Sequence, residues 1–331
     1  MIDKNRVFRV LQLAGLVGLL AACGPSFAAE SDAAGDEIEV VPVRGGVYML
    51  VGGGVNATLQ IGDDGVLLVD TMQEDMAEHL LAAVRKLSDK PIRYVLNTSG
   101  NPDQVGGNPV IAAAGSTINA GNVAGAIADS TVGAAVVAHE NVLTRMSVQD
   151  PPPPFEGWPT STYFFTPTKD VFFNGEAIQL IYQPDAVTNG DSFVYFRRSD
   201  VISAGSIFDF TRYPFIDVDN GGTFAGTLES LNNLIDLTVP EDKQEGGTMV
   251  IPARGRLCDE SEVVEYRDML TIIGNYIREM IDEGRSLEQV LEARPTLAYD
   301  PRYGADSGSW TTDMFVETVY REFTANGSSE Q

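Results

Sequence analysis

The sequence predicts an α/β fold in which two β-sheets pack together and helices cover their outer sides. Short strand patterns rich in β-branched and aliphatic residues occur in two sets, one in each half of the chain, and helical patterns follow each set. The 331 residues are 44% hydrophobic and 21% charged, a composition that supports a sizeable folded core. Because helices follow strands in both halves, we expect the helices to lie outside the two sheets.

The N-terminal residues have the pattern of an export signal. A positively charged start precedes the apolar run LQLAGLVGLLAA and contains Lys4, Arg6 and Arg9. The apolar run is too short to span a bilayer as a helix. The next residues, LAAC, resemble the bacterial lipobox, which implies cleavage before Cys23 and acylation of this cysteine. Cleavage as an ordinary signal peptide is the alternative. We therefore predict a lipoprotein signal peptide at residues 1–22.

Residues 23–37 are predicted to be a lipidated cysteine followed by a flexible tether, because the segment is small and acidic. Several acyl chains would hold the protein on a membrane. Gly24, in place of an aspartate after the cysteine, indicates sorting to the outer membrane in a host that has one. We expect an exported, membrane-anchored lipoprotein, at the outer membrane or facing the periplasm. The second cysteine, Cys258, has no intramolecular partner and is expected to be a buried, small apolar residue.

The charge of the chain is strongly acidic. There are 47 Asp and Glu residues against 22 Lys and Arg, which gives a formal net charge of -25. This balance argues against binding to nucleic acid or to an anionic lipid surface through a basic patch. We interpret it as a well-solvated acidic surface.

The first half of the chain alternates strands and helices. Its first strand patterns are GVYMLVG, NATLQIG and GVLLVDT, separated by glycine or Asp-Gly turns. The segment QEDMAEHLLAAVRKLS has helical spacing of Met76, Leu80, Val84 and Leu87. PIRYVLNT is the next strand, and the polar stretch NTSGNPDQVGGN lies at its carboxyl end. A helix, a strand around AAVVAHE and a helix from Glu140 follow. In α/β proteins, such loops at strand ends carry the functional sites.

The second half repeats the pattern after a proline-rich segment at residues 150–160, which is a surface connector or, alternatively, a lid beside a pocket. Its strand patterns are DVFFNG, AIQLIYQP, DSFVYFRRS and DVISAGS. ESLNNLIDLTV is helical, TMVIPARG is a strand, and residues 260–284 form a long amphipathic helix that ends at Gly284. Ser286 and Gln289 predict a capping box for a short helix, and TTDMFVETVYREF predicts the last helix.

Six segments, in this order, resemble motifs of the metallo-β-lactamase superfamily. GVLLVDT resembles the strand that ends in a supporting aspartate, here Asp70. NTSGNPDQVGGN is similar to NT-H-x-H-x-D-H-x-GGN, and VVAHENVLTRM to AHEN-x-x-x-RM. AVTNGDSFVYF is similar to AHTDGDSxVYF, AGSIFD to TGDxF, and IPARGRLCDESEV to IPGHGxLxD. The resemblance implies an α/β (α+β) fold, an αββα sandwich of two mixed β-sheets flanked by helices. It predicts this domain at residues 38–285 and a C-terminal helical extension at residues 286–331.

The metal-ligand positions of the family are altered in this chain. In the family, histidines and carboxylates hold zinc at these positions, because both are good zinc ligands. Among the seven positions, only Asp103 keeps its type. The replaced positions are Ser99, Asn101, Gln104, Val187, Ser206 and Arg254. The resemblance therefore implies a site without a zinc cofactor. Any metal held by one carboxylate and neutral oxygens would bind weakly, nearer to calcium or magnesium.

Two roles follow for the altered site if it is not an enzyme. In the first, Arg254 replaces the metal by pairing with Asp103, and with Asp70 behind it, and the substitution preserves the fold. In the second, the site binds a small polar or anionic ligand, because an arginine suits carboxylate or phosphate. The residues of this second role are Arg254, Ser99, Asn101, Gln104 and Ser206.

A third hypothesis for the site is a hydrolase that acts without metal. Ser99 and Ser206 are its candidate nucleophiles, and each needs a base within hydrogen-bond reach. The chain has two histidines, and both are interpreted as structural: His79 flanks the apolar face of the first predicted helix, and His139 lies in the AHEN segment, which the resemblance implies is not a metal position. We therefore assign no catalytic residue.

The sequence as a whole predicts an exported, lipid-anchored protein of this fold that has lost its zinc site and has a binding or regulatory role. The alternative is a hydrolase of the same fold that acts with a weak noncanonical metal or without metal. The predicted contacts are the membrane, through Cys23, and a small polar or anionic ligand at Arg254. Nucleic acid is excluded.

Overall fold

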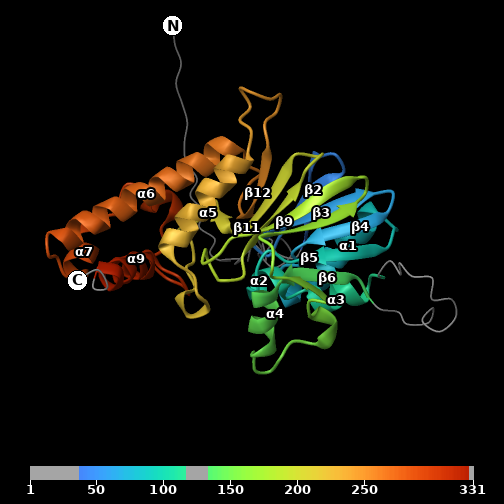
Figure 1. Cartoon of the computed structure of the whole chain (residues 1–331), viewed down its shortest axis with the longest axis horizontal. Helices are drawn as coiled ribbons and strands as arrows, with labels where there is room; N and C mark the ends of the chain where they lie inside the picture. The colour runs from blue at the N-terminus through green and yellow to red at the C-terminus, as the bar shows by residue number, and fades with distance from the viewer. Residues whose placement is uncertain (1–36, 117–132, 328–331) are drawn as a thin grey trace, which may run out of the picture. The chain divides into compact units, whose positions relative to one another are not determined.

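The computed structural model describes residues 37–116 and 133–327 (Figure 1). The predicted signal peptide, Cys23 and the tether up to residue 36 lie outside the described residues. No helix in the two described ranges is long and apolar enough to cross a membrane.

Seven strands form the first sheet, and they follow one another in the sheet as they do in the chain. They are β1 (Glu39–Arg44), β2 (Val47–Gly52), β3 (Val55–Gly62), β4 (Gly65–Val69), β5 (Ile92–Leu96), β6 (Ala135–His139) and β7 (Ser161–Tyr163). Strands β1 to β4 pair antiparallel, and β4 to β7 pair parallel. Gly53 and Gly54, both with positive φ, form the turn between β2 and β3.

Five strands form the second sheet, in the order β12-β11-β10-β9-β8. They are β8 (Thr168–Phe173), β9 (Glu176–Tyr182), β10 (Ser192–Phe196), β11 (Val201–Asp209) and β12 (Met249–Arg254). All pairs are antiparallel except β11 with β12, so this sheet is also mixed. Leu67 and Leu96 of the first sheet share one buried cluster with Leu180 and Ile251 of the second. The two sheets therefore pack together, as predicted.

Helices cover the outer faces of both sheets (Figure 1). In the first half they are η1 (Glu74–Met76), α1 (Ala77–Leu87), α2 (Pro102–Val105), α3 (Asn108–Ala113), α4 (Glu140–Ser147) and η2 (Phe155–Gly157). In the second half they are η3 (Val218–Asn220), α5 (Phe224–Leu237), α6 (Glu260–Asp282), α7 (Leu287–Ala293), α8 (Asp300–Tyr303) and α9 (Thr312–Gly327). Helices α1 and α3 share a buried cluster with the first sheet, and α5, α6 and α9 share one with the second. This arrangement confirms the αββα sandwich.

Local sequence signals set the ends of the helices. Met76, Leu80 and Val84 are buried under α1 as predicted, whereas Leu87 at its end is exposed. Gly284, with φ 78°, follows the end of α6. The predicted capping box of α7 is present, with the Ser286 hydroxyl accepting from the N–H of Gln289 and the Gln289 side chain accepting from the N–H of Ser286.

The C-terminal helices belong to the core of the second sheet. Phe315 of α9 is fully buried in the same cluster as Phe224 of α5 and Ile273 of α6. The Phe315 ring also stacks on Tyr213, with centroids 4.8 Å apart. The predicted extension therefore contributes buried side chains to the sandwich itself.

Candidate functional site

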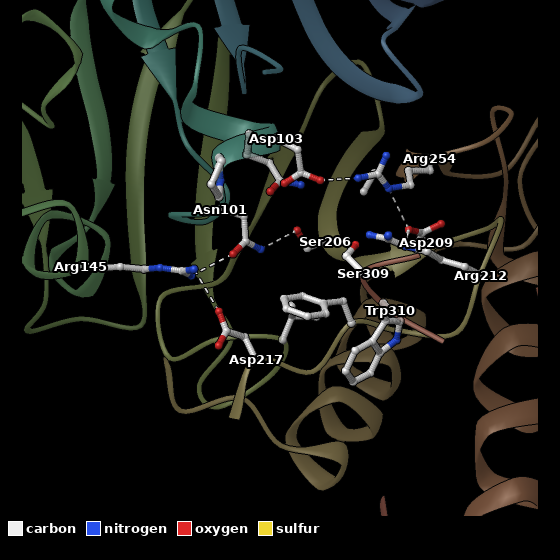
Figure 2. Close-up of a pocket in the computed structure, with 15 residues that line it drawn as sticks. Asn101, Asp103, Arg145, Ser206, Asp209, Arg212, Asp217, Arg254, Ser309 and Trp310 are labelled. Carbon is white, nitrogen blue, oxygen red and sulfur yellow. Dashed lines mark hydrogen bonds and ion pairs between the residues drawn. The ribbon is translucent and has the colours of Figure 1, made fainter. Parts of the chain in front are cut away.

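The predicted site residues gather at a cavity of about 310 Å³ (Figure 2). Strands from both sheets end beside it: Asn101 follows β5, Asp209 ends β11 and Arg254 ends β12. Of the predicted residues, those that line the cavity are Asn101, Asp103, Gln104, Val187, Ser206 and Arg254. Six of the eight residues that the resemblance pointed to therefore line one cavity, and Asp70 and Ser99 do not.

Arg254 is a fixed cation at this cavity. Its Nη2 donates to Asp103, its Nε lies 3.2 Å from Oδ2 of Asp209, and its Nη1 donates to the carbonyl of Gly54 at 2.7 Å. The pairing with Asp103 is as predicted. The second carboxylate is Asp209, so the predicted pairing with Asp70 is wrong. Since all three nitrogens have partners, Arg254 holds two carboxylates together in the wall of the cavity.

Asp70 lies deeper, where Thr98 holds it. Its carboxylate accepts hydrogen bonds from the Thr98 N–H at 2.8 Å and from the Thr98 hydroxyl at 2.6 Å. Burial raises the pKa of Asp70 to about 7, although the bonds from Thr98 lower it. Gly205 in β11, with φ 55°, leaves room for Thr98, because a Cβ there would lie 2.4 Å from the Thr98 hydroxyl. Asp70 therefore supports the loop below the cavity and does not pair with Arg254.

Ser99 is also outside the lining of the cavity. It is fully buried, its hydroxyl donates to Oε1 of Gln104 at 3.1 Å, and it accepts the N–H of Asn101 at 3.1 Å. Ser99 therefore fixes two of the residues that do line the cavity. It is not accessible to a ligand, which corrects its predicted place among the ligand-binding residues.

Two further arginines line the cavity and are not among the predicted site residues. Arg145 of α4 donates to Oδ1 of Asn101 at 2.8 Å and to Oδ2 of Asp217 at 3.0 Å. The segment VVAHENVLTRM contains Arg145, so a motif pointed to it. Arg212 donates from Nε to Oδ2 of Asp209 at 2.8 Å. Within the described part of the chain, the two terminal nitrogens of Arg212 have no hydrogen-bond partner. No motif in the sequence signals Arg212.

The charges around the cavity compensate one another. Three guanidinium groups face the carboxylates of Asp103, Asp209 and Asp217 (Figure 2). Asn101 joins the two sides, because it accepts from Arg145 and donates to the Ser206 hydroxyl at 3.2 Å. The terminal end of Arg212, whose side chain is 36% exposed, is the guanidinium surface that a ligand can reach most directly.

The remaining wall of the cavity is aromatic. Phe215 and Trp310 meet edge to face, with ring centroids 5.0 Å apart, and both line the cavity together with Ser309. Ser309 and Trp310 come from the loop between α8 and α9, in the predicted extension. Sequence reasoning missed them, because no motif connects this loop to the strand ends, of which even the nearest in sequence, at Arg254, comes 55 residues before Ser309.

Neither candidate serine nucleophile has a base beside it. The Ser206 hydroxyl accepts from Asn101, and the Ser99 hydroxyl donates to Gln104. In residues 37–116 and 133–327, no histidine or carboxylate is hydrogen-bonded to either serine. The arrangement therefore lacks the proton acceptor that a serine nucleophile requires.

The histidines and the cysteine have structural environments. His139 caps α4, where its Nδ1 accepts the N–H of Asn141 at 3.3 Å, and its ring stacks on Tyr182 with centroids 3.8 Å apart. Burial lowers the pKa of His139. His79 is exposed on α1 and does not line the cavity. Cys258 is buried as predicted, and burial raises its pKa to about 12, which disfavours the thiolate.

The residues at the cavity do not fit a two-zinc centre. No group of three or more His, Cys, Asp and Glu side chains that could hold a metal ion occurs in the described ranges. Asp103, the one retained ligand type, is paired with Arg254. Val187 is fully buried and has no donor atom, and the amides and hydroxyls at the other positions are weak zinc ligands.

The proline-rich segment lies beside a different cavity. Pro151 to Pro154 line a space of about 420 Å³, and no residue of 150–160 lines the cavity of Arg254. Trp158 holds the segment in place by donating to the carbonyl of Pro153 at 2.8 Å. The segment is therefore not a lid over the cavity of Arg254.

Known structures share this fold. A metallo-beta-lactamase from Pontibacter korlensis aligns with a TM-score of 0.53 and 16% identity, over 71% of this chain and 99% of that one. A double mutant of the sec-alkyl sulfatase PisA1 aligns with a TM-score of 0.63 and 14% identity, over 86% of this chain and 50% of that one. The DIM-1 metallo-beta-lactamase aligns with a TM-score of 0.52 and 14% identity, over 71% and 97%. At these identities the likeness concerns the fold alone.

Sequence comparison points the same way. No curated protein sequence matches this chain significantly. The family model described as the metallo-beta-lactamase superfamily matches residues 50–241, more than half of the chain. The matched range includes the strands of the first sheet from β3 on and most of the second sheet. The chain therefore belongs to the metallo-beta-lactamase superfamily.

Proposed function

We propose that this protein does not use zinc and that its cavity binds a small organic anion. In this proposal it is a pseudoenzyme of the metallo-beta-lactamase fold, with a binding or regulatory role at the cell envelope. Acylated Cys23 would anchor it there, as the lipobox-like LAAC suggests. The alternative is a hydrolase that acts with a weak metal or with none.

The observation that carries the proposal is the position of Arg254. Its guanidinium pairs with Asp103 and Asp209, so the carboxylates at this place already have a cation. A metal ion would have to displace a group that the protein cannot deprotonate at ordinary pH. Displacement would also leave a buried guanidinium without its partners, which is costly.

The free end of Arg212 supports an anionic ligand. A guanidinium presents parallel N–H donors that match a carboxylate or a phosphate. In the described residues, these donors on Arg212 have no internal partner, whereas those of Arg254 are engaged. Arg212 therefore takes the ligand-binding role that the sequence alone suggested for Arg254.

Two measurements on one preparation test the proposal. Protein produced in zinc-supplemented medium without chelator is analysed for metal by mass spectrometry, and we expect far less than one ion per chain. One or two tightly bound ions per chain would contradict the proposal and favour a hydrolase that uses metal. The same protein is then screened for binding of small carboxylates and phosphate esters by ligand-observed NMR.

The matched variants are Arg212→Ala and Arg256→Ala. Arg256 is exposed and does not line the cavity, so its removal should leave binding unchanged. We expect Arg212→Ala to weaken binding of any anion found by at least about tenfold, since a charge-assisted hydrogen bond contributes about 1.5–3 kcal/mol. Equal binding by the two variants would contradict the proposed site.

A further inference from the structure

We infer that the loop between α8 and α9 makes the cavity selective for organic carboxylates that carry an aromatic body. The inference rests on the proposed function, because it names the class of anion that the cavity would take. Trp310 is its specificity-determining residue.

The loop that carries Trp310 has a fixed position. The N–H of Thr312 donates to the carbonyl of Ala305 at 2.9 Å, and the N–H of Ala305 donates to the Thr312 hydroxyl at 2.9 Å. These two bonds close the loop at its base. Ser309 and Trp310, near its end, line the cavity.

The same C-terminal region also holds the segment that carries Arg212 and Phe215. The N–H of Tyr213 donates to the carbonyl of Tyr303 at 3.2 Å, and the Tyr213 hydroxyl donates to Oδ1 of Asp300 at 3.1 Å. Phe215 packs against Trp310. The anion-binding end of Arg212 and the aromatic wall are thus held by one set of contacts, and Figure 2 shows Arg212 and Trp310 on the side of the cavity away from Arg145.

These two features define the ligand class. A carboxylate matches the donor fork of Arg212, and an aromatic ring packs favourably against Trp310 and Phe215 by stacking or edge contacts. The cavity of about 310 Å³ is at the small end of ligand pockets, so it suits a single ring better than a long chain. The match to the superfamily ends at residue 241, so Ser309 and Trp310 lie outside the matched range, whereas Phe215 lies within it.

The test compares phenylacetate with acetate, which share the carboxylate and differ in the ring. Dissociation constants for the full chain are measured by ligand-observed NMR for the wild type, Trp310→Ala, Trp310→Phe and Trp158→Ala. Trp158, the other tryptophan, does not line the cavity and is the matched control. Melting temperatures show whether each variant is folded.

We expect the wild type to bind phenylacetate about tenfold more tightly than acetate, the difference that burial of one ring with aromatic contacts supports. Trp310→Ala should abolish this difference without changing acetate binding, whereas Trp310→Phe and Trp158→Ala should keep it. Equal binding of both acids by the wild type would overturn the inference and leave the proposed anion site intact. Binding of neither acid would overturn the inference, and if no phosphate ester of the screen bound either, the proposed anion site would be overturned as well.

Discussion

Arg254 shows how one residue can replace the cation of a site. Its side chain is 17% exposed, and it faces Asp209, whose side chain is 4% exposed. A buried carboxylate that loses its partner keeps the full cost of desolvation. The guanidinium therefore preserves an arrangement of carboxylates that would otherwise repel one another.

Replacing Arg254 by Met should destabilise the fold. We expect Arg254→Met to lower the free energy of unfolding by about 2–4 kcal/mol, since it leaves the carboxylate of Asp103 without a cation and removes one of the two cations beside Asp209. Arg256→Met, two residues away, removes an ion pair with Glu262 and a contact with the Phe210 ring, and because the Arg256 side chain is 62% exposed it should cost less than about 1 kcal/mol. Urea unfolding measures both variants. Similar losses in the two variants would contradict the structural role of Arg254.

The raised pKa of Asp70 predicts that the stability of the fold depends on pH. Burial raises its pKa from 3.8 to about 7, so between these pH values the folded chain keeps a proton that the unfolded chain has lost. The contribution of Asp70 to the free energy of unfolding is therefore fully present below about pH 4 and is lost as the pH rises through 7. Asp191, also buried, has its pKa raised to about 7 and acts in the same direction.

Asp70→Asn should make this dependence shallower. Each of the two groups contributes a slope of up to about 1.4 kcal/mol per pH unit, and an amide does not titrate. The asparagine can still accept from the N–H of Thr98 and donate to its hydroxyl. The free energy of unfolding is measured with urea at pH 5, 6 and 7. Parallel pH profiles for the variant and the wild type would show that Asp70 does not cause the pH dependence.

At the scale of elements, helix α9 connects the C-terminal region to the cavity. Its buried face packs on α5 and α6, and Phe315 reaches Tyr213 in the segment that carries Arg212. The helix thus stabilises the second sheet and positions one wall of the cavity at the same time. A truncation after residue 285 would remove both contributions.

Neighbouring residues of α9 provide a matched test. Phe315 is fully buried, and Phe315→Ala should lower the free energy of unfolding by about 3–5 kcal/mol because it leaves a cavity in the core. Met314 is 41% exposed, and Met314→Ala should change the free energy of unfolding by less than about 0.5 kcal/mol. Chemical denaturation of both variants measures the difference. If Phe315→Ala behaved like Met314→Ala, α9 would not belong to the cooperative core.

At the scale of the whole molecule, the net charge weakens binding to an anionic membrane, whereas the proposed lipid anchor strengthens it. A net charge of -25 repels the chain from anionic lipid, so the protein surface itself does not hold it on such a membrane. In our proposal, the acyl chains on Cys23 supply the membrane affinity. The fold then needs no membrane-binding face of its own.

The two cysteines allow a direct test of the anchor. Cells that express the chain are labelled with an alkyne-tagged fatty acid, and the label on the purified protein is measured. We expect label on the wild type and on Cys258→Ser, and none on Cys23→Ser, because Cys258 is buried in the folded chain. Label on Cys23→Ser, or its absence from the wild type, would rule out the proposed lipidation.

Sequence reasoning predicted the sandwich, and the structure confirms it. The alternation of strands, the glycine turn at Gly53 and Gly54, and the capping box at Ser286 depend on neighbours a few residues apart, and these are readable directly from the order of residues. The resemblance to the superfamily also pointed to Asn101, Asp103, Ser206 and Arg254, and these residues line one cavity in the structure.

The partners of these residues were decided by tertiary packing. Arg254 pairs with Asp209 and not with Asp70, since Thr98 already engages Asp70 below the cavity. Arg212 and Trp310 joined the site through contacts between segments far apart in the chain, which no local pattern encodes. By itself, the sequence determined the fold and the loss of the family's zinc ligands. Only the tertiary structure decided which charges pair with one another and that, among the described residues, the terminal nitrogens of Arg212 have no hydrogen-bond partner, because that depends on the exact distances between side chains.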